Sequence, residues 1–229
     1  MEEHMRSNLS HVKAEGAASR SIIYGALSAA FRQPREAHRQ VLAVVNKVIP
    51  TLNFPQWESL ATLMNAVLDK LGSSGMFLIL GVEYNRLFVG PNPPRVYPYE
   101  SMYQEPGGSI MGEAALRVLS AYAQEGLCPG DMEKDLPDHV AMELEFLAYL
   151  CSREAAALEG KNEEKVFHYV NRQRDFIRHH LALWVSPFCR RILRETQEDF
   201  YKCWANLLEK FIRWEAKRLE VQVHGESLA

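Results

Sequence analysis

The chain has 229 residues, of which 47% are hydrophobic and 24% charged, and its formal net charge is −3. This is enough apolar material for one full-size core. Lysine and arginine total 26 against 29 aspartate and glutamate, so the basic excess of a nucleic-acid-binding protein is missing. The longest apolar run, residues 76–82, is far shorter than the ~20 residues that a bilayer span needs. We therefore expect no nucleic-acid partner and no stable membrane insertion.

Residues 1–16 are polar and lack the apolar segment of an export signal. None of the four cysteines (Cys128, Cys151, Cys189 and Cys203) belongs to a C-x-x-C pair. Scattered, unpaired cysteines are typical of reduced thiols in the core of a cytosolic protein. The sequence therefore predicts a cytoplasmic location.

A helical period runs through almost the whole chain. Pro34, Pro50 and Pro55 divide its first third and predict helices near 9–32, 35–49 and 55–71. Residues 77–88 then carry one apolar helix stripe, and no segment alternates apolar and polar residues for long enough to predict a strand. The pattern predicts an all-α protein, a single compact helical bundle of about eight to eleven helices.

Residues 90–108 interrupt this pattern with five prolines and three tyrosines. Each proline disfavours helix at the residue before it. A connection of this length is usually functional or disordered, and its aromatic content argues against disorder. We expect an ordered loop that packs on the body of the protein and exposes some of its side chains.

A second break, at residues 127–137, predicts a hinge between an N-terminal part (1–126) and a C-terminal part (138–229). Pro137 suits the first turn of the helix that follows, with Asp138 as an acidic cap at its positive end. Pro187 predicts the start of a short helix towards Arg194, and the last helix is expected over about 196–221.

His139 and Glu143 lie one helical turn apart, as a metal-binding pair would. Two ligands do not make a site, and the simpler interpretation is a helix cap followed by polar side chains. Glu143 and Glu145 point about 200° apart and do not converge. There is no nucleophile elbow and no phosphate-binding loop. We therefore predict no catalytic residue, no metal ligand and no cofactor, with a helical metal enzyme using His139 and Glu143 as the alternative.

The aromatic and proline residues around the loop are the other candidate site. Tyr84, Leu87, Phe88, Pro98 and Tyr99 would suit a peptide, because aromatic side chains supply contact area at low entropic cost. For Leu87 and Phe88 a place in the core is the competing interpretation. Acidic neighbours would pair with arginines of such a peptide, and the candidates are Glu83, Glu100, Asp138 and Glu143.

Two motifs carry a family resemblance. The first is Leu87-Phe88-x-Gly90-Pro91 with Pro98-Tyr99-Glu100-Ser101-x-Tyr103, and the second is Pro137-Asp138-His139-Val140 with Glu143-Leu144-Glu145-Phe146. Together they resemble the signatures of the TorD/DmsD family of maturation chaperones. Leu136 stands where the family hinge usually has glutamate. A weaker likeness extends the match to about residues 20–215.

The resemblance implies an all-helical cytoplasmic chaperone that is not an enzyme. Its partners would be the twin-arginine signal peptide and the apo catalytic subunit of a molybdopterin oxidoreductase, held for cofactor insertion before export. The residues matching the family's peptide-binding positions are Tyr84, Leu87, Phe88, Pro98, Tyr99, Ser101, Asp138 and His139, with Glu100 and Glu143 as further acidic contacts. Monomer and domain-swapped homodimer both stay open, as does the identity of the client.

Two family or class features are not carried over. Guanine nucleotides bind some family members, but this sequence has no phosphate loop to hold one. A helical transcription regulator would need a short basic recognition helix, and residues 32–39, the candidate segment, contain Pro34.

Overall fold

The computed structural model describes residues 2–90, 93–105, 107–127 and 135–226, and the side chains of residues 11–220 within these ranges. These residues form helices and no strand, which confirms the all-α prediction. The α-helices are α1 (Glu2–Ala30), α2 (His38–Ala43), α3 (Val45–Val48), α4 (Trp57–Lys70), α5 (Met76–Tyr84), α6 (Ser101–Gln104), α7 (Glu113–Gln124), α8 (Val140–Glu159), α9 (Glu163–Phe176), α10 (Ala182–Glu195) and α11 (Asp199–Glu226). A 3₁₀ turn, η1 (Ile49–Leu52), and two π-helical turns, η2 (Asn85–Val89) and η4 (Ile177–Leu181), connect or extend them.

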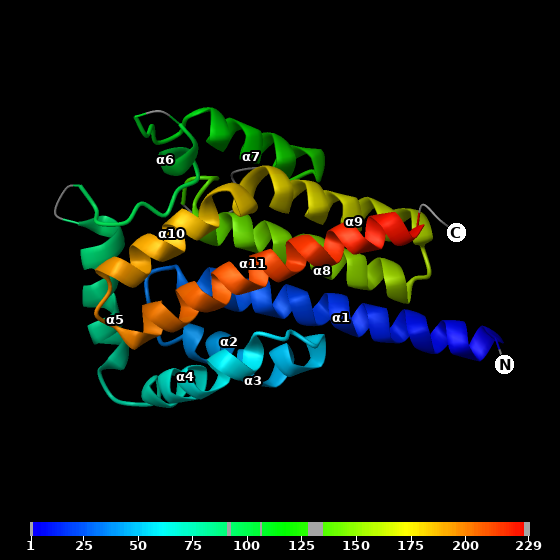
Figure 1. The fold of residues 1–229 in the computed structure, drawn as a ribbon, viewed down its shortest axis with the longest axis horizontal. Helices are drawn as coiled ribbons and strands as arrows, with labels where there is room; N and C mark the ends of the chain where they lie inside the picture. The colour runs from blue at the N-terminus through cyan, green and yellow to red at the C-terminus, as the bar shows by residue number, and fades with distance from the viewer. Residues whose placement is uncertain (1, 91–92, 106, 128–134, 227–229) are drawn as a thin grey trace.

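The long helices α1, α8, α9, α10 and α11 lie roughly lengthwise in the molecule, and α1 packs along α8 (Figure 1). Their apolar stripes meet in one buried cluster that includes Tyr24, Trp184 and Trp204. Helices α2, α3 and α4 cover one side of this bundle, and α6 and α7 lie on the opposite side (Figure 1).

Helix α5 stands across the end of the bundle (Figure 1). It continues without a break into the π turn η2, and Gly90 ends this turn with a φ of 93° that favours glycine. The chain then turns back along the bundle towards α6. A π turn replaces α geometry at Leu87 and Phe88, and such turns are frequent at functional sites.

Three helix boundaries differ from the sequence prediction. The expected helix at 35–49 is divided into α2 and α3. Pro137 lies outside α8, which begins at Val140. Pro187 lies inside α10 rather than at the start of a helix. Proline there leaves the carbonyl of Leu183 without its helical donor, but Leu183 is exposed and water can replace that donor.

The predicted hinge lies partly outside the described residues, because residues 128–134, including Cys128, are among those not described. The division into 1–126 and 138–229 stays an expectation. Both parts supply side chains to the same core, from Ile23 in α1 to Leu219 in α11. The other three cysteines are buried free thiols, as the sequence predicted.

Candidate functional site

The two motifs singled out in the sequence lie against each other. Residues 98–100 of the loop pair with residues 138–140 before α8 through an antiparallel bridge between Tyr99 and His139. The Glu100 N–H donates to the Asp138 carbonyl at 3.0 Å, and the Val140 N–H donates to the Pro98 carbonyl at 2.8 Å. The bridge fixes the loop on the start of α8 and places the ring of Tyr99 edge-on to that of His139, with centroids 5.3 Å apart.

Asp138 does not cap α8, contrary to the sequence prediction. Its Oδ2 instead accepts hydrogen bonds from the N–H and the hydroxyl of Ser101, at 3.0 and 2.6 Å, and so caps the short helix α6 across the bridge. The cap of α8 is His139, whose Nδ1 accepts from the N–H of Ala141 at 3.1 Å. Burial lowers the pKa of His139 to about 4, which keeps its imidazole neutral and able to accept this bond.

Glu100 and Glu143 are both fully buried. His180 of η4 lies 2.8 Å from Glu100 through its Nδ1, and Trp184 of α10 donates its indole N–H to Glu143 at 3.3 Å. Neither carboxyl group reaches the surface in this conformation, so their role as acidic contacts for a client stays a prediction that requires the loop to move.

Other residues of the predicted set also face inward. Leu87, Phe88, Pro98 and Ser101 are buried, and Leu87 and Phe88 belong to the core cluster, as their competing interpretation held. Phe88 packs against Tyr201 of α11 with ring centroids 5.8 Å apart. These side chains pack in the interior beneath the loop. Their contact with a client stays a prediction.

Tyr84 and Tyr99 are the two half-exposed members of the predicted set. The pKa of Tyr84 is raised to about 12, mainly by burial and to a smaller extent by the nearby charges of Asp135 and Tyr99. Burial and Asp135 likewise raise the pKa of Tyr99. The two tyrosines and Asp135 therefore share one stretch of surface, where the loop meets α5 and the start of α8.

An arginine and two carboxylates that the sequence prediction missed border this surface. The guanidinium of Arg32, just after α1, lies 3.2 Å from Asp135 and 2.9 Å from Glu145 of α8. Arg32 is 10% exposed at its side chain, whereas Asp135 and Glu145 are 40% and 43% exposed. Of the three, Glu145 alone is marked in the sequence, by its place in the second motif, and on α8 it points away from the buried Glu143.

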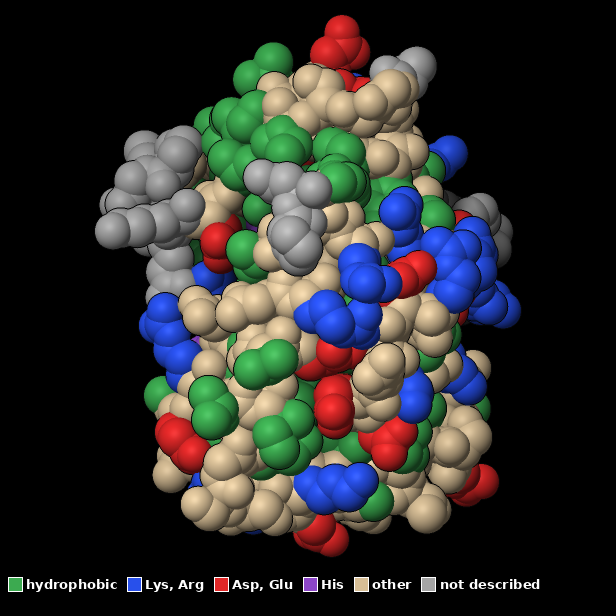
Figure 2. Space-filling view, turned by 90° about the vertical axis from the view of Figure 1, so that its left-hand side faces the viewer, with side chains coloured by type: hydrophobic (Ala, Val, Ile, Leu, Met, Phe, Trp, Pro, Cys, Tyr) green, Lys and Arg blue, Asp and Glu red, His purple; other side chains and the backbone are tan. Residues whose placement is uncertain are grey.

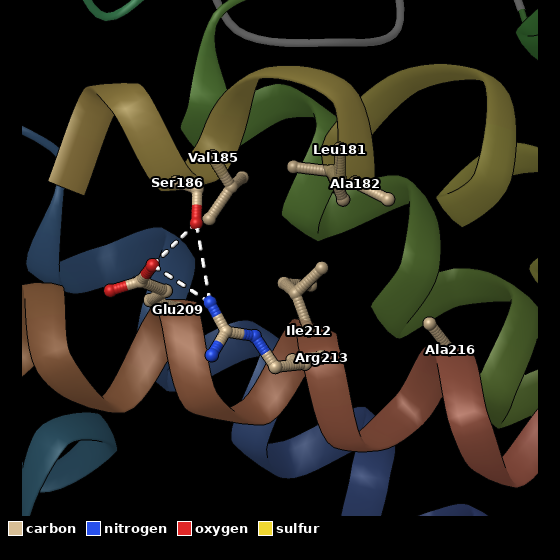
Figure 3. Close-up of a pocket in the computed structure, with 8 residues that line it drawn as sticks. All are labelled: Leu181, Ala182, Val185, Ser186, Glu209, Ile212, Arg213 and Ala216. Carbon is tan, nitrogen blue, oxygen red and sulfur yellow. Dashed lines mark hydrogen bonds and ion pairs between the residues drawn. The ribbon is translucent and has the colours of Figure 1, made fainter.

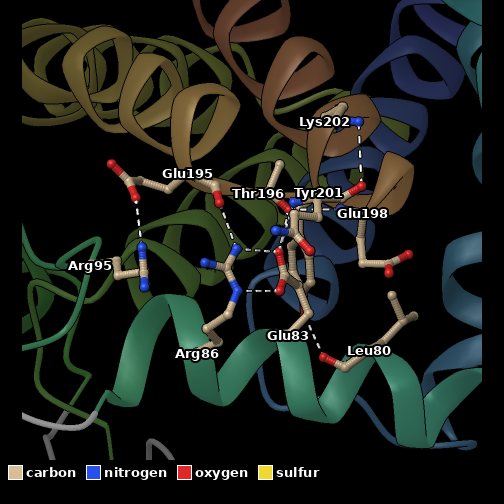
Figure 4. A network of polar contacts seen from close by, with 10 residues as sticks. Leu80, Glu83, Arg86, Arg95, Glu195, Thr196, Glu198, Tyr201 and Lys202 are labelled. Carbon is tan, nitrogen blue, oxygen red and sulfur yellow. Dashed lines mark hydrogen bonds and ion pairs between the residues drawn. The ribbon is translucent and has the colours of Figure 1, made fainter.

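A polar network holds α5 in place across the bundle end (Figure 4). The carboxylate of Glu83 accepts from the Arg86 guanidinium at 2.6 and 2.8 Å and from the Thr196 hydroxyl at 2.7 Å. These hydrogen bonds lower the pKa of Glu83 against the effect of its burial. Glu83 therefore ties α5 to the turn between α10 and α11 and does not face the tyrosines as an acidic contact.

A hollow of about 140 Å³ lies elsewhere, between η4–α10 and α11 (Figure 3). Ser186, Glu209 and Arg213 form its polar end, where the Ser186 hydroxyl and the Arg213 guanidinium both contact the Glu209 carboxylate. Its volume is well below the roughly 300–1,000 Å³ of ordinary small-molecule pockets. None of its lining residues belongs to the predicted set.

Within the described ranges, no group of three or more histidine, cysteine, aspartate and glutamate residues is placed to hold a metal ion. His139 and Glu143 contact different partners, so the structure lends the metal-enzyme alternative no support. Among the helices described, none combines the length and apolar character that crossing a membrane requires.

Comparison with known proteins agrees with this architecture. A protein assigned to redox enzyme maturation from Archaeoglobus fulgidus has a similar crystal structure, with a TM-score of 0.53 at 22% identity over 84% of this chain and 93% of that one. At this identity the likeness speaks for the fold alone.

Similar sequences carry chaperone names. Chaperone protein TorD of Vibrio parahaemolyticus is 27% identical over 72% of this chain and 74% of its own length. The chlorate reductase assembly chaperone protein of Ideonella dechloratans is 38% identical over 38% of this chain and 43% of its own length. The model of the nitrate reductase delta subunit family matches residues 57–190, which include both motifs. The chain therefore belongs to the nitrate reductase delta subunit family, as one of its TorD/DmsD maturation chaperones.

Proposed function

We propose that this chain is a cytoplasmic chaperone for the catalytic subunit of a molybdopterin-containing oxidoreductase. It binds the twin-arginine signal peptide and the body of that subunit, and holds the subunit for cofactor insertion before export. The relatives named above support the class of client, since one is an assembly chaperone of a reductase.

The observation that carries the signal-peptide assignment is the surface formed by Tyr84, Tyr99, Asp135 and Glu145. Asp135 and Glu145 already hold one guanidinium, that of Arg32, and both keep exposed carboxylate area. Carboxylates bind arginine through paired, charge-assisted hydrogen bonds, and tyrosine rings add apolar contact area next to them. This chemistry suits a peptide that presents arginines followed by an apolar segment.

Titration calorimetry with a synthetic twin-arginine signal peptide tests this assignment. We expect micromolar or tighter binding, and clearly weaker binding of the same peptide with two lysines, because lysine cannot make the bidentate contact. Asp135→Asn combined with Glu145→Gln should weaken the twin-arginine peptide. Glu159→Gln, at the exposed end of the same helix α8, is the matched control. Equal affinity for both peptides, or no binding of either, would refute the assignment.

For the body of the client, the outward face of α5 offers a second surface. Leu78, Ile79, Val82 and Val89 are exposed by 74%, 51%, 64% and 55%. Arg86, Arg95 and Arg194 lie at the same end of the molecule, each in an ion pair with Glu83 or Glu195, and Figure 2 shows hydrophobic side chains and a group of Lys and Arg side chains on this face. Exposed apolar residues beside cations fit an apolar partner surface with acidic neighbours.

The two surfaces can be tested separately. Leu78→Ser combined with Val82→Ser should weaken capture of the apo catalytic subunit and leave the affinity for the isolated signal peptide unchanged. Leu116→Ser on α7, where the leucine is 60% exposed, is the control for losing one exposed apolar side chain. Unchanged capture of the subunit by the double variant would contradict the role of α5.

A further inference from the structure

Three carboxyl groups are buried together beneath the bridge. Glu100, Asp138 and Glu143 are all 0% exposed, and each has one oxygen with no hydrogen-bond partner: Oε1 of Glu100, Oδ1 of Asp138 and Oε1 of Glu143. Three ionised carboxylates in so small a buried volume would repel one another strongly. The arrangement therefore calls for a proton.

The contacts of the other oxygens indicate where that proton lies. Oδ2 of Asp138 accepts from Ser101, Oε2 of Glu100 faces His180, and Oε2 of Glu143 accepts from Trp184. The carboxyl groups of Glu100 and Glu143 lie within hydrogen-bonding reach of each other, and each has one oxygen left without a partner. A proton on Glu143 would let its carboxyl group donate a hydrogen bond to the Glu100 carboxylate, which has an unpartnered oxygen to accept it.

We propose that Glu143 is a positioning residue that carries one proton and shares it with Glu100, and that this proton holds the Tyr99 loop on α8. Glu100 lies next to Tyr99 in the loop, Glu143 lies in the first turn of α8, and the hydrogen bond between them crosses from one element to the other. It reinforces the two backbone bonds of the bridge from the buried side.

The surroundings agree with this assignment. Burial raises the pKa of Glu143 well above the ordinary glutamate value, and the charge of Glu100 raises it further. Asp138 acts in the same direction, while the Trp184 hydrogen bond opposes it. His180 faces the pair from η4 across Glu100. From α7 the fully buried Tyr122 faces the cluster, and the same carboxyl groups add to the rise that burial causes in its pKa.

The sign of the pH dependence follows from the direction of the shift. Because the folded pKa of Glu143 lies above its unfolded value, the folded state binds more protons. The contribution of Glu143 is fully present below the unfolded pKa of about 4.5 and is lost as pH rises towards the folded value. Loss of the proton leaves repelling charges between loop and helix, which should release the loop and disorder Tyr99.

Infrared spectroscopy of the full chain tests the proton itself. Wild-type protein at pH 7 should show the absorption of a buried protonated carboxyl group, and the band should disappear on titration to higher pH. Glu143→Gln keeps the shape and a donor towards Glu100, and it should lack the band. The matched control, Glu159→Gln, should keep it. Absence of the band from wild-type protein at pH 7, or its persistence in Glu143→Gln, would overturn the proposal.

The consequence for the client rests on the proposed function. Above the folded pKa, wild-type affinity for the twin-arginine peptide should fall about tenfold per pH unit, since one proton is coupled to the ordered loop. Glu143→Gln should bind with an affinity that stays flat over the pH range in which the wild-type affinity falls. An equal decline in both proteins would contradict the role of the proton. Failure of wild-type protein to bind any peptide would refute the proposed function and leave the infrared result standing.

Discussion

Asp138→Ala is expected to lower the free energy of unfolding by about 3–6 kcal/mol. In the folded chain the Asp138 carboxylate accepts two hydrogen bonds from Ser101, at 3.0 and 2.6 Å, and it is fully buried. Hydrogen bonds to a charged group are worth about 1.5–3 kcal/mol each. The net cost exceeds the ~1 kcal/mol of a typical surface helix cap.

Urea unfolding at pH 7 measures this difference, and Ser101→Ala provides the internal comparison. Ser101→Ala removes the hydroxyl donor and keeps the N–H bond, so it should cost less than Asp138→Ala. Asp138→Asn keeps an acceptor of similar shape and should fall between the two. A loss below about 1 kcal/mol for Asp138→Ala, or a larger loss for Ser101→Ala, would refute the bridging role of this carboxylate.

Three further predictions concern other parts of the molecule. Tyr99→Ala should weaken binding of the twin-arginine peptide by about 2 kcal/mol or more in calorimetry with little change in melting temperature, because Tyr99 is only half-buried. Arg20→Gln should cost about 3–5 kcal/mol in urea unfolding, since it leaves Glu154 as a buried carboxylate without a cation, whereas Glu215 keeps Arg218. For His139 the folded pKa of about 4 lies below the unfolded value of 6.5, so its contribution, about 3 kcal/mol, is present above pH 6.5 and lost towards pH 4. His139→Asn can still cap α8, and its free energy of unfolding should depend less on pH across that range.

The helical fold was predictable because its signal is local. The apolar stripe at 77–88 shows a helical period within one short segment, and each proline of the first third marks a helix boundary locally. Pro187 shows the limit of that information. A proline inside a helix usually kinks or breaks it. In α10 the carbonyl that loses its donor belongs to Leu183, which is exposed to water, and the helix continues past Pro187. The π turns η2 and η4 likewise depend on packing and leave no mark in the sequence.

The site was predictable only in part, for a different reason. Both motifs were recognised, but their pairing joins residues 98–100 to 138–140, and no sequence period links segments so far apart. Asp138 precedes an apolar helical run, so a local interpretation makes it the cap of α8. The bridge turns its carboxylate towards Ser101 instead. Exposure is also a tertiary property, and it separates Tyr99 from Glu100 although the two are adjacent in the chain.

The buried and the exposed residues of this site have different roles. Glu100, Ser101 and Asp138 make specific buried hydrogen bonds that few other side chains could replace. Such residues fix the course of the loop, whatever ligand it presents. The carboxylates of Asp135 and Glu145 are in more exposed positions, where both pair with Arg32 and Glu145 also accepts a hydrogen bond from Ser28. We therefore expect that the buried set determines whether the binding surface forms, and that the exposed set, with Tyr84 and Tyr99, determines which signal peptide it accepts.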